Sequence, residues 1–347
     1  MKFINPSYQL EPGSKKHICP SPSCGKKRFV RYVEKATGDY LPEQYGRCDR
    51  EANCGYHLNP YKDGYVIKDQ DLQGGKVNVG MGKSTPVLPF AKAFVPFSVL
   101  QLTLLANGYK RNIFIQNLLK NIPFPFSEKD VEKVIELYYL GTLNKGYLSG
   151  ALTIPYIDRS GNVRAVQVKT FDEQNHTIKT NFLHSIAEKH YLKQGHEMPK
   201  WLKDYLKNES KVSCLFGEHL LDKYPDNPIA LVEAPKTAIY STLYFGLPDQ
   251  PDNFLWLAVF NLSSLKLEKC KVLKGRRIIL FPDLSKTGNA FKLWSNKAVE
   301  FEKEMPGTTF TVSDLLERNA NDQEREAGLD LADYLIKLDW RAFKMDK

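Results

Sequence analysis

The stretch IALVEAPKTAIY, residues 229–240, runs from an apolar segment of buried-strand length through Glu233 into a helical pattern. The stretch RIILFPDLSKTG, residues 277–288, repeats this design and carries Asp283 at the corresponding place. A helical segment and a third apolar run, residues 254–260, lie between the two stretches. Continuous apolar runs that alternate with helical patterns predict an α/β domain built on a mostly parallel sheet covered on both faces.

The two acidic residues at the strand ends predict a ligand site. In open parallel sheets the ligand crevice lies at the carboxyl ends of the strands, so we expect Glu233 and Asp283 to face one site. Two carboxylates suit Mg²⁺, which takes oxygen ligands and brings phosphates with it. The alternative is that both are ordinary carboxylates at the edge of a sheet.

The combination of VEAPKTA with the later LFPDLSKTG resembles the Toprim domain of bacterial primases, topoisomerases and some nucleases. The resemblance covers about residues 229–334 and implies a Rossmann-like sheet. It also implies that Glu233 and Asp283 hold catalytic Mg²⁺ or Mn²⁺ and that the catalytic Lys236 contacts phosphate. The alternative for Lys236 is a surface lysine at the start of a helix. The usual second motif has two aspartates with one residue between them, whereas this chain has Ser285 at the later position. One metal ligand is therefore missing, or replaced by a weak hydroxyl.

Two further acids near the end of the chain are candidate metal ligands. The segment GLDLADYL, residues 328–335, resembles the end of a primase Toprim domain, where an acidic residue can face the metal site. Asp330 and Asp333 are three residues apart on an expected helix and would share one face. Either could supply the missing ligand, and an exposed acidic helix face is the alternative.

Four of the six cysteines cluster near the start of the chain in two short knuckles separated by 23 residues. Tetrahedral Zn²⁺ needs four soft or borderline ligands, and paired cysteines followed by glycine supply them from tight turns. His17 and His57 are possible substitutes for a cysteine, His57 for Cys54 in particular, while Cys214 and Cys270 are expected to be buried thiols. The predicted zinc ligands are Cys19, Cys24, Cys48 and Cys54.

The residues between the knuckles predict a zinc ribbon, with a strand from Arg28 and a return strand beginning at Tyr40 and Leu41. The segments CPSPSCGKKRFVRY and GRCDREANCGYH resemble the zinc-ribbon end of primase-like proteins from bacterial mobile elements. In primases, too, a zinc module precedes a Toprim core. Basic residues interleaved with Phe29 and Tyr32 would offer phosphate contacts and a stacking surface for single-stranded DNA. The equal alternative is a solvated strand face with its aromatic side chains packed inward. These basic residues are Lys26, Lys27, Arg28 and Arg31.

Length and composition indicate a folded protein of two or three domains. The chain has 347 residues, of which 42% are hydrophobic and 12% aromatic. It contains no apolar run of roughly 20 residues and its start lacks a signal peptide, so we expect a cytoplasmic protein with no membrane partner. The net charge is +9, and the first 60 residues carry ten lysines and arginines against six acids. A polyanionic partner is expected, with the N-terminal region as its electrostatic footprint.

The predicted domains are a zinc ribbon (1–60), a linker (61–90), a helical and β-hairpin region (91–225) and the Toprim-like domain (226–347). The linker is rich in glycine and turn residues. Within it, Gly82-Lys83-Ser84 is not a P-loop, because the required earlier glycine is replaced by Val77.

The third of these regions is expected to be mixed α+β and similar to the core of a primase. Helical patterns cover residues 97–107, 112–120 and 128–140, and a β-hairpin covers residues 152–169. In place and pattern the hairpin is similar to the primase segment that helps to form the nucleic-acid path. Arg164 and Lys169 would then contact phosphate, although a solvated strand face is an equal alternative.

These features predict a primase-like protein that carries out Mg²⁺-dependent nucleotidyl transfer on single-stranded DNA during replication of a mobile element. Its expected partners are single-stranded DNA, nucleotides and a replicative helicase supplied in trans. The rival is a non-catalytic DNA-binding or adaptor protein with a degenerate Toprim site, which the serine at position 285 favours. A Toprim nuclease is the third alternative.

Overall fold

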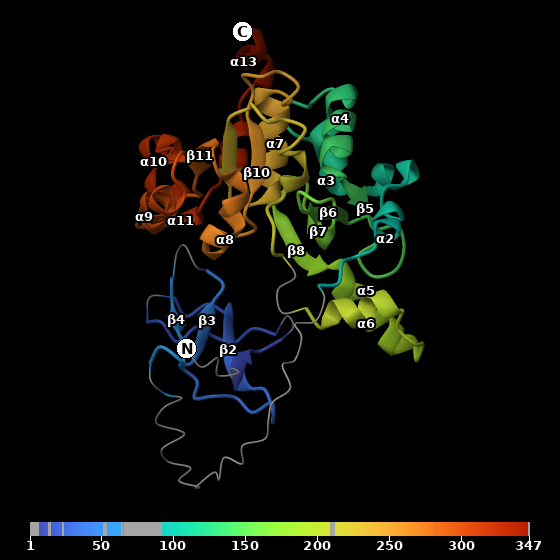
Figure 1. The fold of residues 1–347 in the computed structure, drawn as a ribbon, viewed down its shortest axis with the longest axis vertical. Helices are drawn as coiled ribbons and strands as arrows, with labels where there is room; N and C mark the ends of the chain where they lie inside the picture. Colours follow the sequence, from blue (N-terminus) through green and yellow to red (C-terminus); the bar gives the residue numbers. More distant parts are fainter. Residues whose placement is uncertain are drawn as a thin grey trace. The chain divides into compact units, whose positions relative to one another are not determined.

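The computed structural model describes residues 7–12, 15–22, 24–50, 54–63, 65, 92–208 and 212–345. They separate into two compact units, residues 1–90 and 91–347, each of which is described by itself (Figure 1). Most of the predicted linker, including Gly82-Lys83-Ser84, lies outside the described residues. No helix in the described ranges is both long enough and apolar enough to cross a membrane.

The first unit is an antiparallel sheet with strands in sequence order. Its strands are β1 (Tyr8–Leu10), β2 (Phe29–Glu34), β3 (Gly46–Cys48) and β4 (His57–Leu58). The return strand starts at Gly46, whereas Tyr40 makes only an isolated bridge to Val33. The predicted start of that strand is wrong because Pro42 follows and the chain turns there, with the Tyr45 N–H donating to the Pro42 carbonyl at 2.9 Å.

The core of the described part of this unit is small. One cluster combines Phe29 with the buried cysteines, and the other is built on Tyr32, Leu41 and Tyr45. Such a small apolar core is typical of modules that depend on a bound metal for their stability.

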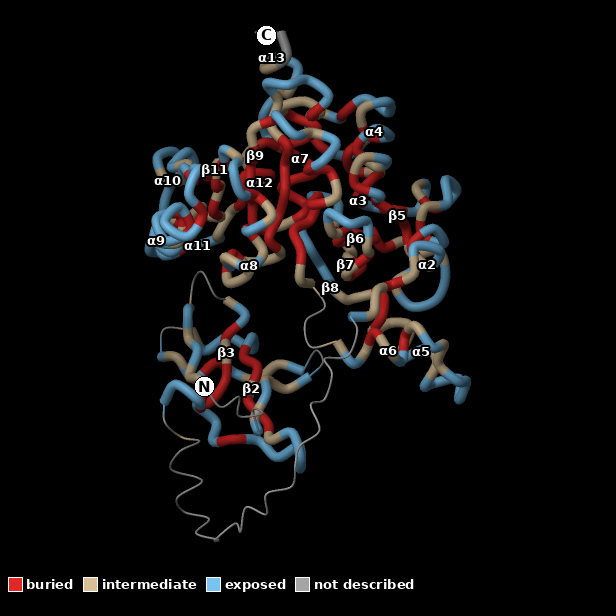
Figure 2. The backbone as a smooth tube through the Cα atoms, in the orientation of Figure 1, coloured by how far each residue is buried: buried red, intermediate tan, exposed pale blue. Residues whose placement is uncertain are grey.

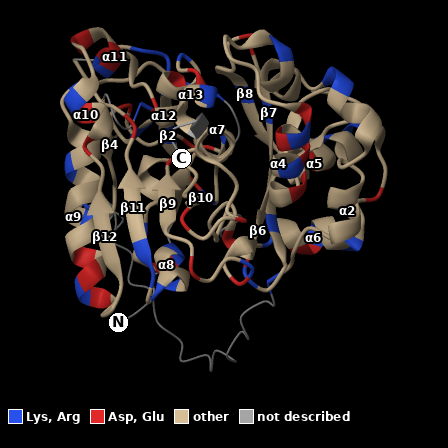
Figure 3. Ribbon diagram, turned by 90° about the horizontal axis from the view of Figure 1, so that it is seen from above, with Lys and Arg blue, Asp and Glu red and all other residues tan. Residues whose placement is uncertain are grey.

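The second unit contains the predicted parallel sheet, so the α/β assignment is confirmed. All of its pairings are parallel and the strand order is β10-β9-β11-β12 (Figure 3). The strands are β9 (Ile229–Val232), β10 (Leu255–Ala258), β11 (Arg277–Phe281) and β12 (Thr309–Val312). The strand β12 was not predicted, because its alternating sequence Thr-Phe-Thr-Val is only four residues long, too short to stand out as a strand pattern.

The direction of the connections changes between β9 and β11. From β9 the chain passes through α7 (Pro235–Phe245) to β10 on one side, and from β11 it passes through α9 (Asn289–Glu304) to β12 on the other. Right-handed crossovers in opposite directions place α7 and α9 on opposite faces of the sheet. The sheet is therefore doubly wound, with its topological switch point between β9 and β11.

The same unit contains a second, antiparallel sheet in the order β5-β6-β7-β8. The predicted hairpin is confirmed, since β6 and β7 pair in antiparallel fashion. The pairing runs from Leu152, opposite Lys169, to Ile157, opposite Val163. The strands are β5 (Gly141–Thr142), β6 (Leu152–Ile157), β7 (Val163–Phe171) and β8 (Thr177–Phe182). The last of these, β8, is largely exposed and was not predicted.

The helices before this sheet are more broken than the periodicity predicts. The segment expected to be helical over residues 97–107 is divided between α2 and a 3₁₀ turn, and residues 112–120 between α3 and a π-helical turn. The third helix begins as predicted, with the Ser127 hydroxyl accepting from the Asp130 N–H at 3.1 Å. It ends at Tyr139, which has a φ of 51°, rather than at Gly141. The elements are α2 (Phe97–Gln101), η1 (Ala106–Arg111), α3 (Ile113–Gln116), η2 (Asn117–Asn121) and α4 (Glu128–Tyr138).

Helix α7 lies at the centre of the second unit, with every residue from Pro235 to Tyr244 buried (Figure 2). Buried hydrogen bonds join it to the antiparallel half. The Tyr138 hydroxyl lies 2.8 Å from the Thr242 hydroxyl, and Asn175 donates to the Tyr240 hydroxyl at 2.6 Å. Buried polar pairs of this kind favour one packing arrangement of the two sheets.

Shorter elements complete the second unit. They are α5 (Leu183–Gln194), α6 (Lys200–Leu206), η3 (Glu218–Leu220), η4 (Leu262–Ser264), α8 (Leu267–Cys270), η5 (Lys271–Leu273), α10 (Leu315–Asn319), α11 (Asp322–Ala327), α12 (Leu331–Leu335) and α13 (Trp340–Met345).

Candidate functional site

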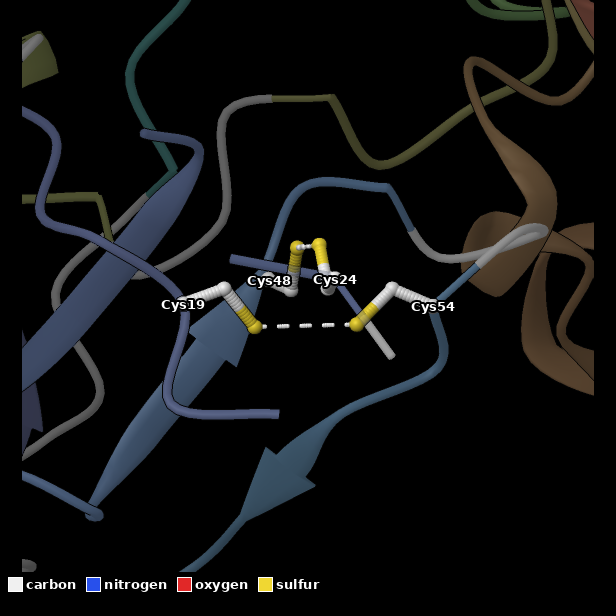
Figure 4. Close-up of side chains that lie close together, drawn as sticks. All are labelled: Cys19, Cys24, Cys48 and Cys54. Carbon is white, nitrogen blue, oxygen red and sulfur yellow. Dashed lines mark hydrogen bonds between the residues drawn. The ribbon is translucent and has the colours of Figure 1, made fainter. Parts of the chain in front are cut away.

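Four cysteine thiols converge in the first unit (Figure 4). The sulfurs of Cys19 and Cys54 are 3.6 Å apart, those of Cys24 and Cys48 are 3.9 Å apart, and all four lie within 4.8 Å of one another. A tetrahedral zinc ion with Zn–S bonds of about 2.3 Å requires S–S separations of about 3.8 Å. The thiols therefore fit a structural zinc ion.

Local backbone geometry explains why the two knuckles form. The Cys24 N–H donates to the Ser21 carbonyl and the Cys54 N–H to the Arg50 carbonyl, so each second cysteine closes a tight turn. Gly25 and Gly55 follow with φ of 54° and 64°, a left-handed conformation that glycine adopts without strain.

The two histidines are oriented away from the thiol cluster. His17 Nε2 lies 2.7 Å from Glu11 Oε2, and His57 Nε2 lies 3.2 Å from the Tyr32 hydroxyl. Cys54 therefore lies in the ligand cluster and His57 does not.

The thiol environments differ in polarity. The Lys26 backbone N–H lowers the pKa of Cys24 to about 7, while burial raises the pKa of Cys48. A bound zinc ion would deprotonate the ligating thiols outright.

A second candidate site lies at the switch point of the parallel sheet. Glu233 directly follows β9, and Asp283 follows β11 by two residues. The two strands are neighbours and run parallel, with Val232 opposite Phe281. Both carboxylates are therefore at the edge where doubly wound sheets bind ligands.

Lys236, in the first turn of α7, forms ion pairs with two further acids near this site. Its ammonium lies 2.9 Å from Asp330 Oδ2 and 2.8 Å from Asp333 Oδ1. Burial alone lowers the pKa of Lys236, but the two carboxylates outweigh burial and hold the pKa above its usual value. The two acids predicted from sequence therefore lie beside the lysine rather than on an open helix face.

Asp330 precedes α12 as its N-cap instead of lying within the helix. Its Oδ1 accepts from the Asp333 N–H, and Asp333 Oδ2 accepts from the Asp330 N–H, both at 3.0 Å. This reciprocal capping box orients both carboxylates.

The Ser285 side chain makes a hydrogen bond to the backbone at the start of α9. Its side chain is fully buried, and its hydroxyl accepts a hydrogen bond from the Ala290 N–H at the start of α9, at 3.0 Å. The hydroxyl thus stabilises a helix terminus.

Asp283 retains free coordinating capacity. Its Oδ1 is buried and has no hydrogen-bond partner among the described residues. Burial, followed by the charges of Glu233 and Asp330, raises the pKa of Asp283 well above its ordinary value. An uncompensated buried carboxyl of this kind fits a cation ligand.

Lys169 reaches the same site from β7 of the antiparallel sheet. Burial, followed by the charge of Lys236, lowers the pKa of Lys169 to about 8, while Asp330 and Asp283 partly oppose this shift. The sequence predicts Lys169 as a phosphate contact on a strand, and the structure places it beside the acids. No local pattern relates position 169 to positions 283 and 330.

The carboxylates alone do not provide a complete set of metal ligands. Within the described ranges, the four cysteines are the only histidine, cysteine or carboxylate group of three or more whose ligand atoms lie within 4.8 Å of one another. Glu233 and Asp283 therefore suit an ion that keeps several waters, which is how Mg²⁺ usually binds.

The ribbon residues predicted to bind nucleic acid divide into two groups. Lys26, Lys27 and Arg28 are exposed. Arg31 instead lies 4.5 Å from the centre of the Tyr40 ring and donates to the Leu41 carbonyl.

Of the two alternatives for the aromatic residues of the ribbon, the structure favours inward packing over a stacking surface. Phe29 is 1% exposed and Tyr32 is 6% exposed. Phe29 packs against Tyr56 beside the cysteines.

Arg164 contacts one residue of its own hairpin and one residue outside it. It lies 3.3 Å from Asp158 Oδ2 and donates to the Ser213 hydroxyl at 2.9 Å. Because its charge is already paired, this arrangement favours a structural role over the predicted phosphate contact.

Two family models match the chain. Residues 6–70 match a zinc beta-ribbon finger family, and residues 112–284 match a domain of unknown function, DUF6371. The second match spans Lys169, Glu233, Lys236 and Asp283 but not the acids of α12. No curated protein matches significantly.

Several solved primase structures are distantly similar. The zinc-binding and RNA polymerase domains of the Aquifex aeolicus primase are 14% identical, with a TM-score of 0.39 over 97% of this chain and 79% of that one. The primase fragment of the bacteriophage T7 primase-helicase is 13% identical, with a TM-score of 0.31 over 89% and 96%. The RNA polymerase domain of the Mycobacterium tuberculosis primase DnaG is 14% identical, with a TM-score of 0.37 over 72% and 80%. Likenesses this distant carry no conclusion about activity, whereas the family match and the thiol cluster together identify the N-terminal module as a zinc ribbon.

Proposed function

We propose that this protein is a primase-like enzyme whose parallel sheet is a Toprim-like domain and which carries out metal-dependent nucleotidyl transfer on single-stranded DNA. The observation that carries the proposal is the placement of Glu233 and Asp283 at the two strand ends that flank the switch point. Replication of a mobile element, with a helicase supplied in trans, is the setting that the sequence resemblance suggests.

Each residue of the site has a role in this proposal. Glu233 and Asp283 would hold Mg²⁺ or Mn²⁺, which when bound neutralises charge on phosphoryl oxygens. Lys169 faces the same acids from the opposite sheet and would bind the phosphates of a nucleotide or strand. The buried start of α7 limits the access of water to the reacting groups.

The test uses single-stranded templates, labelled nucleotides and Mg²⁺ or Mn²⁺, and scores both synthesis and cleavage. Glu233→Gln and Asp283→Asn should each reduce synthesis by at least about 100-fold, because removing a charge-stabilising group typically costs that much. DNA binding should stay within about twofold, because these residues act on the ion and not on the strand.

Matched controls are Glu268→Gln and Asp314→Asn, which alter exposed acids that pair with Lys271 and Arg318, respectively. Both controls should retain wild-type synthesis. Cleavage without synthesis would favour a nuclease.

A non-catalytic adaptor is the second candidate, and the use of Ser285 as a helix-terminus acceptor favours it. An adaptor predicts no synthesis or cleavage by the wild type, with or without a helicase. It also predicts unchanged DNA binding in both carboxylate variants.

A further inference from the structure

An ammonium group already lies between two of the four acids at the candidate metal site. Lys236 Nζ is within 2.9 Å of both Asp330 and Asp333, and the side chains are only 10%, 10% and 18% exposed, respectively. Buried ion pairs of this geometry are costly to separate, because removing one partner leaves an uncompensated charge.

Every oxygen of this acidic pair has a hydrogen-bond or ionic partner. Asp330 uses Oδ2 for Lys236 and Oδ1 for the Asp333 N–H, while Asp333 uses Oδ1 for Lys236 and Oδ2 for the Asp330 N–H. A divalent ion that bound these carboxylates would lie close to the Lys236 ammonium, which would repel it.

The balance of ionised side chains at the site also indicates a single divalent ion. Four carboxylates interact at the site, and two lysines, Lys169 and Lys236, oppose them. Two negative charges remain, which one divalent cation would neutralise. In the absence of nucleotide, a second divalent cation would leave the buried site with two excess positive charges, at a high electrostatic cost.

The remaining oxygen ligands also point to a single ion. The Ser285 hydroxyl already accepts a hydrogen bond from α9, whereas the buried Asp283 Oδ1 has no hydrogen-bond partner in the described part of the chain. A metal ion can therefore enter beside Asp283 without breaking an existing hydrogen bond to that oxygen.

We propose that Lys236 is a built-in cation that fills the Asp330–Asp333 half of the site, so that the site takes one divalent ion, at Glu233 and Asp283, instead of two. This inference rests on the metal site of the proposed function. It makes Lys236 a residue that sets metal stoichiometry by holding the acidic pair, rather than one that contacts phosphate.

The test is a Mn²⁺ titration of the full-length, zinc-loaded protein, with free Mn²⁺ followed by electron paramagnetic resonance. Mn²⁺ ions that a protein binds in excess of the number bound by the Asp283→Asn variant are assigned to the site. We expect one such ion in the wild type and two in Lys236→Met, because that substitution removes the ammonium and frees two carboxylates. Lys271→Met, which alters an exposed lysine paired with Glu268, should bind one ion as the wild type does.

A wild type that binds two ions, or a Lys236→Met variant that binds one, would overturn the inference and leave the proposed function standing. A wild type that binds one ion but lacks all nucleotidyl transfer would instead refute the proposed function alone. A wild type that binds no ion would refute both.

The Lys236→Met variant could unfold without metal, because its acids would lose their counter-charge. Its thermal unfolding would then be followed as Mn²⁺ is added. Refolding by Mn²⁺ but not by an equal ionic strength of K⁺ would support the inference, and failure to refold with Mn²⁺ would overturn it.

Discussion

Lys169 and Lys236 face the same acids, yet their pKa values shift in opposite directions. Lys236 makes two direct ion pairs that outweigh its burial, so its pKa rises. Lys169 is affected by burial and by the positive charge of Lys236, and its pKa falls to about 8. Direct pairing, rather than burial alone, decides which lysine keeps its proton most firmly.

His219 provides a pH-dependent prediction at the same scale. Its Nε2 donates to the Leu137 carbonyl at 3.1 Å, and its buried Nδ1 has no hydrogen-bond partner among the described residues. Burial lowers the pKa of His219 to about 4, below the usual value near 6.5 in an unfolded chain. The unfolded state therefore binds more protons between these pH values, and the folded state loses stability as pH falls from 6.5 toward 4.

Replacing His219 with Gln should remove this pH-dependent loss of stability while keeping an N–H donor for the Leu137 carbonyl. Wild type should lose stability relative to His219→Gln by up to about 1.4 kcal/mol per pH unit across that window. Denaturant unfolding of both proteins at pH 7.5, 6, 5 and 4.5 measures the difference. Parallel stability profiles would contradict this account.

At the scale of elements, the ribbon depends on its metal because its strands bury too little surface. Within the described part of the first unit, β3 and β4 have three and two residues, and one of the two core clusters is made largely of the cysteines themselves. Without zinc, that cluster would hold mutually repelling or poorly solvated thiols.

We therefore expect a chelator, or Cys48→Ser, to unfold the ribbon and leave the second unit intact. Zinc modules gain roughly 10 to 16 kcal/mol of apparent binding energy from the metal, more than a core of this size supplies. Hydrogen exchange should rise across β1 to β4 and stay unchanged in β9 and β11. Cys270→Ala, at a buried thiol outside the cluster, should retain zinc. Protein purified without chelator but lacking stoichiometric zinc would disprove the zinc site.

At the scale of the whole molecule, the net charge of +9 is unevenly spread along the sequence. Lys26, Lys27 and Arg28 are exposed and adjacent on the ribbon. Some other lysines are paired with acids, as at α6 and its C-cap, where Lys200, Lys203 and Lys207 pair with Asp204 or Glu197. We therefore expect Lys26, Lys27 and Arg28 to contribute to the electrostatic attraction for a polyanion.

Charge reversal of Lys26, Lys27 and Arg28 to glutamate should weaken binding of single-stranded DNA for every sequence. The slope of log affinity against log salt should fall by roughly 0.7 for each phosphate that the variant no longer neutralises. Reversal of the three α6 lysines should change the slope less, because their charges are already paired. Fluorescence anisotropy at several salt concentrations measures both variants, and an unchanged slope in the ribbon variant would place the footprint elsewhere.

The sequence alone determined the features that depend on local pattern. Apolar runs followed by Glu233 and Asp283 predicted the parallel sheet and its acidic edge, because the carboxyl ends of parallel strands meet there. Paired cysteines followed by glycine predicted the zinc knuckles, because ligand type and turn geometry are encoded within a few residues.

Only the tertiary structure decided which charged side chains of the acidic site contact one another. The Lys236–Asp333 contact joins positions 97 residues apart, and Lys169 reaches the site from another sheet. The hydroxyl of Ser285 turns toward the start of α9, although its sequence position suggested a metal ligand. Strand and helix periodicity fix which way a residue points within its own element, but the packing of α7 between the two halves decides which charges meet and which oxygens stay available for an ion.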